Sequence, residues 1–268
     1  WLGQVRVGEC VAKHCEHAEN CGYVFTKLRA RAAQLLVVNH AMLGYDLARG
    51  GGKMFGQYDV LVIDEAHAAP NFFRDAVSLH LTPRQPELLG RALKDTPYAP
   101  PEAFEDAFKV LFSSLPNREA KLELSKPIQG ALARILAFGQ TLAGSLGDPE
   151  EAEVGSDAHG KAKLAAAART VADIVAARQM VLGENKDPRR DPDNHIAYIE
   201  RSARDEHLIT VSPLEVGPFI APSLLGLHAV IITSATLSTT GGSMGFIRRE
   251  YGLNADQVTK ELVLPSPF

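Results

Sequence analysis

A run of apolar residues that ends in two adjacent acids constrains the fold of this chain more than any other feature. Its residues are Val60-Leu61-Val62-Ile63-Asp64-Glu65-Ala66-His67. Four apolar, mostly β-branched residues are typical of a buried strand in a parallel sheet. Open α/β sheets carry their chemistry just beyond the carboxyl ends of such strands. We therefore predict an α/β fold with a parallel sheet and with both acids at its active edge.

Adjacent carboxylates at this position favour a nucleoside triphosphate as the ligand. Asp64 would hold Mg²⁺ on the phosphates of ATP, and Glu65 would orient or deprotonate the attacking water. The octet thus has the form of a Walker B element of the DEAH type. The alternative is that Asp64 caps an ordinary helix, but adjacent acids after a buried strand are unfavourable without a site to serve.

The composition is that of a globular protein and limits the partners of the chain. Of its 268 residues, 46% are hydrophobic and 22% are charged, with a formal net charge of −4. Nucleic acid binding would therefore require a local basic patch. No apolar run reaches the roughly 18 residues that span a membrane, so we expect a cytoplasmic protein without membrane contact. The chain does not begin with Met, which suggests an internal piece of a longer protein.

Three cysteines lie close together near the start of the chain, at Cys10, Cys15 and Cys21. An odd number cannot pair fully as disulfides, which a cytoplasmic setting disfavours in any case. The cluster indicates a metal ligand set with one ligand missing, because Zn²⁺ and a [4Fe–4S] cluster normally take four protein ligands. His14 or His17 could complete a zinc site, a fourth cysteine could lie upstream, or the thiols could be free. The spacing does not choose between these alternatives.

A phosphate-binding loop of the form Gly-x4-Gly-Lys-Ser/Thr is missing from the sequence. The nearest candidate is Gly50-Gly51-Gly52-Lys53, but Met54 follows the lysine and Leu47 occupies the place of the first glycine. We interpret residues 50–52 as a flexible loop before a strand. The phosphate loop is expected upstream of Trp1.

A second apolar strand ends in small hydroxyl residues. Val230-Ile231-Ile232-Thr233 leads into Ser234-Ala235-Thr236-Leu237. Hydroxyl groups at a strand end can bond to neighbouring acids and sense a bound nucleotide. The same tripeptide also occurs in turns and helix caps, but its position after the acidic octet favours a role in the site.

The spacing of apolar residues predicts α/β segments on both sides of a helical insertion. Helices are predicted at 23–33, through 42–47, and at 86–94, 102–115, 118–146, 158–182 and 216–225. Strands are predicted at 35–38, 58–63, 195–201, 207–212 and 229–233, with 195–212 forming a hairpin. The acidic segment 147–160 is expected to be a mobile tip.

The order of these motifs resembles that of a known family. The cysteine cluster, the Val38-Asn39-His40 stretch, the DEAH octet and the late Ser-Ala-Thr-Leu are together similar to the iron–sulfur superfamily 2 DNA helicases, the XPD/DinG group. They look most like its bacterial DinG branch. The ending Leu264-Pro265-Ser266-Pro267-Phe268 also resembles the family's link into its second motor domain. The resemblance covers essentially the whole chain.

The resemblance implies a RecA-like parallel sheet of helicase motor domain 1, interrupted by an all-α arch insertion and preceded by part of an iron–sulfur domain. The implied division places the C-terminal part of the iron–sulfur domain at 1–33 and the first part of motor domain 1 at 34–80. The arch would follow at 81–190, the second part of motor domain 1 at 191–250, and the start of the link to motor domain 2 at 251–268.

The family also implies roles for individual residues. A [4Fe–4S] cluster would be held by Cys10, Cys15, Cys21 and a fourth cysteine outside the chain. Asp64 would bind Mg²⁺ and Glu65 would be the catalytic base, while His67 would couple the ATP site to DNA. Ser234 and Thr236 would form the motif III relay at the nucleotide.

Members of the family unwind DNA in the 5′ to 3′ direction on single-stranded and forked substrates, and some serve DNA repair. By this resemblance, the parent protein would be a monomeric ATP-dependent helicase. The chain lacks the phosphate loop and the second motor domain with its arginine finger, so we expect it to be inactive alone.

DNA contacts are expected beside the cysteine cluster. Lys27, Arg29 and Arg31 would line the phosphate backbone, and Tyr23 and Phe25 would stack on bases. Alternatively, the basic residues are a solvated helix face and the aromatic residues belong to a core.

Two further functions remain open from the sequence. One is a zinc-stabilised superfamily 2 RNA or DNA translocase, which would be colourless where a cluster protein is brown. The other is a non-catalytic DNA-binding module.

Overall fold

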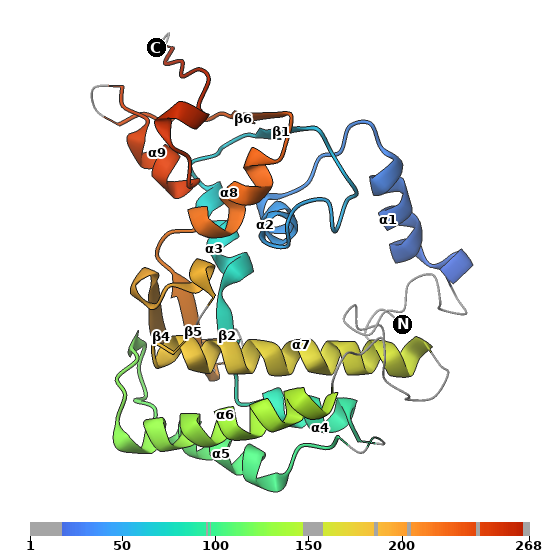
Figure 1. Ribbon diagram of the computed structural model, residues 1–268, viewed down its shortest axis with the longest axis vertical. Coiled ribbons are helices and arrows are strands. Elements are labelled where there is room, and N and C mark those ends of the chain that lie inside the picture. The colour runs from blue at the N-terminus through green and yellow to red at the C-terminus, as the bar shows by residue number, and fades with distance from the viewer. Residues whose placement is uncertain are drawn as a thin grey trace. The chain divides into compact units, whose positions relative to one another are not determined.

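The computed structural model describes residues 18–264, apart from 95, 97, 147–157, 185–186, 203–204 and 240–241. The chain divides into two compact units (Figure 1). Unit 1 consists of residues 79–211 and the chain up to Val24, and unit 2 consists of residues 25–78 and 212–268. Cys10, Cys15, His14 and His17 lie outside the described residues.

Unit 2 contains a parallel pair of strands, as predicted. β1 (Val60–Ile63) and β6 (Ala229–Ile232) run side by side, with Val60 opposite Ala229 and Ile63 opposite Ile232. Both strands consist of apolar, mostly β-branched residues, which have a high propensity for strands. The prediction that the strand before the acids is buried is wrong for one of its faces, because Val60 and Val62 are 53% and 57% exposed. Since parallel strands end at the same edge, the residues after Ile63 and after Ile232 leave the sheet together.

Helices pack against one face of this strand pair to form the core of unit 2. The helices of this region are α1 (Gly22–Ala32), α2 (His40–Ala48), α3 (Ala69–Val77), α8 (Gly217–Leu225) and α9 (Gly245–Glu250), with the short 3-10 turn η6 (Ala255–Gln257). The side chain of Asn39 caps α2 by accepting a hydrogen bond from the Met42 amide, which satisfies one of the unpaired donors at a helix start. The buried core includes Leu47, Ile63, Phe73, Ile220 and Tyr251.

Unit 1 combines long helices with an antiparallel sheet. Its helices are α4 (Gln85–Ala92), α5 (Glu102–Ser113), α6 (Lys126–Leu146) and α7 (Ala158–Val181), with the 3-10 turns η3 (Ala18–Asn20), η4 (Pro188–Arg190) and η5 (Pro192–Asn194). Its strands are β2 (Leu79–Leu81), β3 (Ala120–Lys121), β4 (His195–Arg201) and β5 (His207–Pro213), in the order β2-β5-β4-β3. Helical spacing of residues such as Ile128, Leu132 and Ile135 directs one side of α6 into the core.

The predicted helices and the predicted hairpin are confirmed, but two details of the insertion differ. The insertion is predicted to be all-α, whereas β3 pairs with β4 within it. The helix predicted at 118–146 therefore begins only at Lys126. The hairpin predicted at 195–212 is expected in the parallel-sheet domain, whereas β5 pairs with β2, so that Leu79 lies opposite Val211. Hydrogen bonding to β2 is therefore what places residues 195–211 in unit 1.

The strand predicted at residues 35–38 is wrong. This segment has no strand structure, and Leu35 and Val37 are 84% and 88% exposed. A strand is stabilised by a neighbour that pairs with its backbone, and within the described residues the parallel sheet consists of β1 and β6 alone. Without such a neighbour, apolar β-branched residues do not form a strand here.

Among the residues that the structure describes, no helix combines the length and apolar character required to cross a membrane. The acidic segment predicted as a tip falls mainly on residues 147–157, which lie outside the described part of the chain.

Candidate active site at the edge of the parallel sheet

Pairing of β1 with β6 brings the two strand-end motifs together. The ladder continues past the strands, because the Thr233 amide donates to the Ile63 carbonyl at 2.9 Å and the Ala66 amide donates to the Thr233 carbonyl at 3.0 Å. The acidic octet and the Ser-Ala-Thr segment therefore run alongside each other, although 167 positions separate His67 from Ser234.

Glu65, His67 and Ser234 form a hydrogen-bonded cluster at this edge. The Ser234 hydroxyl donates to Glu65 Oε2 at 3.2 Å, and His67 Nδ1 lies 2.7 Å from Ser234 Oγ and 3.3 Å from Glu65 Oε2. Because Ser234 has one proton and gives it to Glu65, the proton between the ring and the hydroxyl must be carried by His67 Nδ1. Glu65 thus accepts a hydrogen bond from Ser234, which in turn accepts one from His67.

The backbone of Glu65 adopts a left-handed conformation with φ of +46°. This region is unfavourable for a residue with a Cβ, by about 1–3 kcal/mol. The Ala68 amide donates to the Glu65 carbonyl at 3.0 Å and closes the turn. Such a conformation persists where surrounding contacts determine it, and here the contacts are those to Ser234 and His67.

Asp64 has the position and chemistry expected of a ligand for a hard cation. Its Oδ1 accepts a hydrogen bond from the Glu65 amide at 2.9 Å, and the side chain is exposed. None of the described residues donates a hydrogen bond to Oδ2, so a carboxylate oxygen is open to Mg²⁺, which prefers such ligands. Asp64 does not cap a helix, because the cap residue of α3 is Ala68.

Two residues outside the predicted site support the backbone of the octet. His40 Nε2 donates to the Asp64 carbonyl at 2.9 Å, with its ring against Phe72 at a centroid distance of 5.7 Å. Tyr251 is fully buried and its hydroxyl donates to the Ala66 carbonyl at 3.0 Å. From the sequence, His40 could be either structural or functional. The sequence around Tyr251 contains no pattern that predicts its contact with Ala66.

The glycine loop after α2 folds around a buried carboxylate. Asp46 accepts hydrogen bonds from the amides of Gly52 and Met54 at 2.8 and 2.7 Å, and from the Tyr58 hydroxyl at 2.9 Å. Its backbone carbonyl accepts from the Gly51 amide at 3.0 Å. The amides that would bind phosphate in a P-loop are therefore used by Asp46, which agrees with the rejection of this loop as a phosphate site. Burial, with the Asp46 charge beside it, raises the pKa of Tyr58 well above its ordinary value.

Helix α1 presents the predicted DNA-binding residues without a buried face. Tyr23, Arg29 and Arg31 are exposed and Lys27 is half-buried. The Arg29 guanidinium lies 5.7 Å from the centre of the Phe25 ring. The expectation that the aromatic residues might belong to a core is not supported, because Tyr23 and Phe25 are 45% and 60% exposed.

Of the three cysteines predicted to bind a metal, only Cys21 lies among the described residues. Cys21 is a half-buried free thiol immediately before α1. The described residues contain no group of three or more His, Cys, Asp or Glu side chains arranged to hold a metal ion, but the other two cysteines of the cluster lie outside them.

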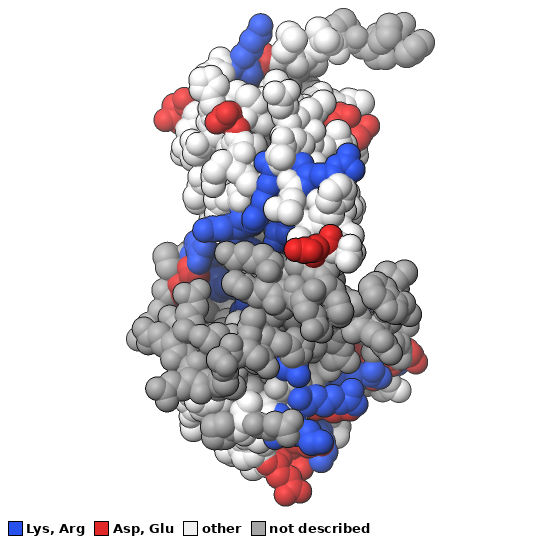
Figure 2. Space-filling model, turned by 90° about the vertical axis from the view of Figure 1, so that its right-hand side faces the viewer, with Lys and Arg blue, Asp and Glu red and all other residues white. Residues whose placement is uncertain are grey.

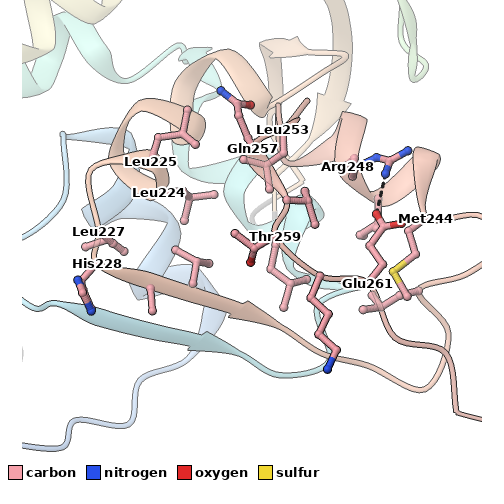
Figure 3. A pocket seen from close by; sticks show the side chains of 17 residues that line it. Leu224, Leu225, Leu227, His228, Met244, Arg248, Leu253, Gln257, Thr259 and Glu261 are labelled. Carbon is pink, nitrogen blue, oxygen red and sulfur yellow. Dashed lines mark hydrogen bonds and ion pairs between the residues drawn. The ribbon is translucent and has the colours of Figure 1, made fainter. Parts of the chain in front are cut away.

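A pocket of about 380 Å³ opens beside β6 in unit 2 (Figure 3). Leu224 of α8, Met244 beside α9 and Leu253 contribute apolar side chains, and an ion pair of 2.7 Å between Arg248 and Glu261 stands at its rim. The residues that line it include none of the predicted site residues.

Comparison with known proteins gives a similarity over nearly the whole chain. No protein-family model matches the sequence. Over 274 residues the chain is 27% identical to the ATP-dependent DNA helicase YoaA of Escherichia coli (strain K12), with 97% of this chain and 41% of that protein aligned. The chain spans about two fifths of the length of this curated relative.

Proposed function

We propose that this chain is part of an ATP-dependent DNA helicase and supplies the acidic side of its ATP site. The observation that carries the proposal is the contact of Glu65 with Ser234 and His67, produced by the parallel pairing of β1 and β6. Similarity over 97% of the chain to a protein named as a DNA helicase supports it. The parallel strand pair would belong to a RecA-like motor domain 1, and α4–α7 to an arch.

The proposed chemistry follows from the positions of the acids. Asp64 would hold Mg²⁺, which neutralises charge on the phosphates when bound. Glu65 would orient a water molecule and accept its proton, since an exposed carboxylate at a sheet edge can reach a nucleotide bound there. Ser234 and His67 would keep Glu65 in place, and Thr236, in the following turn, would complete the relay.

His67 and Ser234 also suit a coupling role. Both contact Glu65 and come from different strand ends, so a shift of either strand end would change the position of the proposed base. Movement caused by DNA binding could therefore reach the ATP site through these contacts, which is how we propose that hydrolysis and translocation on single-stranded DNA are linked.

The cysteines are proposed to hold a [4Fe–4S] cluster. Cys10, Cys15 and Cys21 would supply three thiolates and a cysteine outside the chain the fourth. Cys21 fits this role because it is half-buried and stands at the start of α1, next to the proposed DNA contacts Lys27, Arg29 and Arg31. Iron and sulfide in the purified protein would support a cluster, and one equivalent of zinc would instead support the zinc-stabilised translocase.

The motor as a whole is proposed to act as a monomer in the cytoplasm. It would move 5′ to 3′ on single-stranded DNA and open forked DNA, and this activity would serve DNA repair.

Replacement of Glu65 by Gln tests the proposed role of the acids. In the complete protein, Glu65→Gln is expected to lower ATP hydrolysis by about 100-fold or more, because a positioned general base contributes roughly 10²–10⁴ to the rate. ATP binding should remain, since the amide has the same shape. Rates of phosphate release and nucleotide affinity are the measurements.

A matched control is Glu102→Gln, which changes an exposed glutamate at the start of α5 in the other unit. Its hydrolysis rate should equal that of the unmodified protein. Unchanged ATP turnover in Glu65→Gln would rule out the helicase assignment.

A further inference from the structure

The segment from α1 to the start of β1 is strongly basic within an acidic chain. Residues 22–58 contain five basic residues and one acid, Asp46, while the whole chain has a net charge of −4. Asp46 is fully buried and hydrogen-bonded, so it contributes little negative charge to the surface. The local basic patch that nucleic acid binding requires is therefore present, and it extends beyond α1.

At the C-terminal end of α2, an arginine lies over the ring of a tyrosine. Arg49 lies with its guanidinium 5.4 Å from the centre of the Tyr45 ring, one helical turn earlier. Its Nη1 also donates to the Tyr45 carbonyl at 3.3 Å. Both side chains are exposed, Tyr45 by 43%. The cation–π contact and the hydrogen bond hold the guanidinium over the ring before any ligand binds.

The same arrangement occurs on α1. Phe25 and Arg29 are also four positions apart, with 5.7 Å between guanidinium and ring centre. No described carboxylate forms an ion pair with Arg29 or Arg49, so their positive charges are available to an anion. A solvated helix face explains exposed arginines, but it does not explain an exposed aromatic ring beneath each of them.

The two helices are linked by the glycine loop. Arg31, near the end of α1, donates from Nη2 to the carbonyl of Lys53 at 3.3 Å. Hydrogen bonds from Gly52 and Met54 to Asp46 hold the backbone on both sides of Lys53. Figure 2 shows Lys and Arg atoms gathered in a band across part of one face. The basic residues of segment 22–58 are Lys27, Arg29, Arg31, Arg49 and Lys53.

We infer that Tyr45, Arg49 and Lys53 form a second contact site for single-stranded DNA, distinct from the one proposed on α1. Tyr45 would stack on a base, while Arg49 and Lys53 would bind phosphate groups. Exposed aromatic rings interleaved with basic side chains are the arrangement that binds single strands irrespective of sequence. The inference rests on the proposed function for the identity of the strand as DNA.

Fluorescence anisotropy of a labelled oligothymidylate with the full chain tests this site. Tyr45→Ala is expected to weaken binding roughly tenfold, because a stacked base is lost. Tyr45→Phe keeps the ring and should keep the affinity. Arg49→Ala should lower the slope of log Kobs against log salt concentration by about 0.7, the value for one phosphate contact on a single strand. Tyr45→Ala should leave that slope unchanged.

Matched controls come from α9, where Phe246 is 57% exposed and Arg249 is exposed. Phe246→Ala and Arg249→Ala should bind the oligonucleotide like the unmodified chain. An oligonucleotide with abasic sites should bind Tyr45→Ala and the unmodified chain equally, since it has no base to stack. Unchanged affinity in Tyr45→Ala and Arg49→Ala, or an equal loss in the α9 controls, would overturn the inference.

Two more ligands separate the possible partners. Single-stranded RNA shares the stacking and phosphate chemistry, and much tighter binding of RNA than DNA would overturn DNA as the ligand. Polyglutamate that binds as tightly as DNA would overturn a nucleic acid site altogether. The two proposals can fail separately. If the Tyr45 and Arg49 variants bind DNA weakly but Glu65→Gln leaves ATP turnover unchanged, this DNA site is supported and the proposed helicase function is rejected.

Discussion

At the scale of single residues, Tyr251 shows how a distant side chain positions the candidate site. Its ring is fully buried, edge-on to Phe73 at 6.0 Å, and its hydroxyl donates to the Ala66 carbonyl. The bond holds the backbone between Glu65 and His67. Burial, with a smaller effect from the charge of Glu250, raises the pKa of Tyr251 above its ordinary value.

The raised pKa predicts a loss of stability at alkaline pH. Above about pH 10 the unfolded state releases the tyrosine proton while the folded state keeps it, so the free energy of unfolding falls by up to about 1.4 kcal/mol per pH unit. Below that pH the contribution is fully present. Tyr251→Phe should remove this part of the pH dependence, and at neutral pH it should cost about 1 kcal/mol for the lost hydrogen bond.

Urea unfolding at several pH values between neutral and about pH 11 measures this effect. Tyr45→Phe is the control, because Tyr45 is exposed and its substitution should leave the alkaline decline intact. Equal declines in the Tyr251→Phe variant and the unmodified chain would contradict the assignment.

At the scale of elements, α8 and α9 meet through two glycines. A Cβ added to Gly217, the first residue of α8, would lie 2.5 Å from the Cα of Gly252, just after α9. Gly252 has a φ of +67°, a conformation that favours glycine. The contact also sets the position of Tyr251 next to Gly252, so close backbone packing here supports the acidic turn.

Gly217→Ala is expected to destabilise the protein by about 2 kcal/mol or more, because the new methyl group meets backbone that cannot move aside. Gly130→Ala in α6 is the opposite case, with nothing within 4 Å of the added Cβ. It should stabilise by up to about 1 kcal/mol through higher helix propensity. Thermal unfolding of both variants is the measurement, and changes of the same sign would show that the close contact is absent.

At the scale of the whole molecule, the insertion begins and ends at one place. Leu79 of β2 lies opposite Val211 of β5, and the Ser78 and Ser212 hydroxyls, just outside this pair, are 2.9 Å apart. The insertion has its own core, in which Phe104, Leu132 and Val171 are buried. Neighbouring ends and a separate core are the properties of a domain that can fold alone.

Residues 79–211 produced alone are therefore expected to fold, with a helical circular dichroism spectrum and one cooperative urea transition. Leu132→Ala should lower their free energy of unfolding by about 2–5 kcal/mol, since Leu132 is fully buried. Arg134→Ala, an exposed neighbour on α6, should change it by about 0.5 kcal/mol or less. A gradual, non-cooperative transition would show that the insertion depends on the rest of the chain.

Local patterns predicted most of the elements, because apolar spacing depends on which side of an element is buried. The spacing in α5 and α7 and the apolar runs of β1 and β6 were sufficient to locate them, whereas the start of α6 was predicted eight residues too early. Residues 35–38 have the same apolar, β-branched character as β1 but form no strand. Strand formation requires a pairing partner, which the local sequence does not specify.

The sequence by itself determined the chemical groups of this protein: two acids after a strand, hydroxyl residues after another, and a basic stretch with aromatic residues. Tertiary structure alone decided which of them meet. The register of β1 against β6 brings Ser234 to Glu65, β2 draws the hairpin into the helical unit, and Asp46 takes the amides of the glycine loop. These three contacts depend on burial and on hydrogen bonds that form only when the chain folds. The local spacing of residues does not specify such contacts.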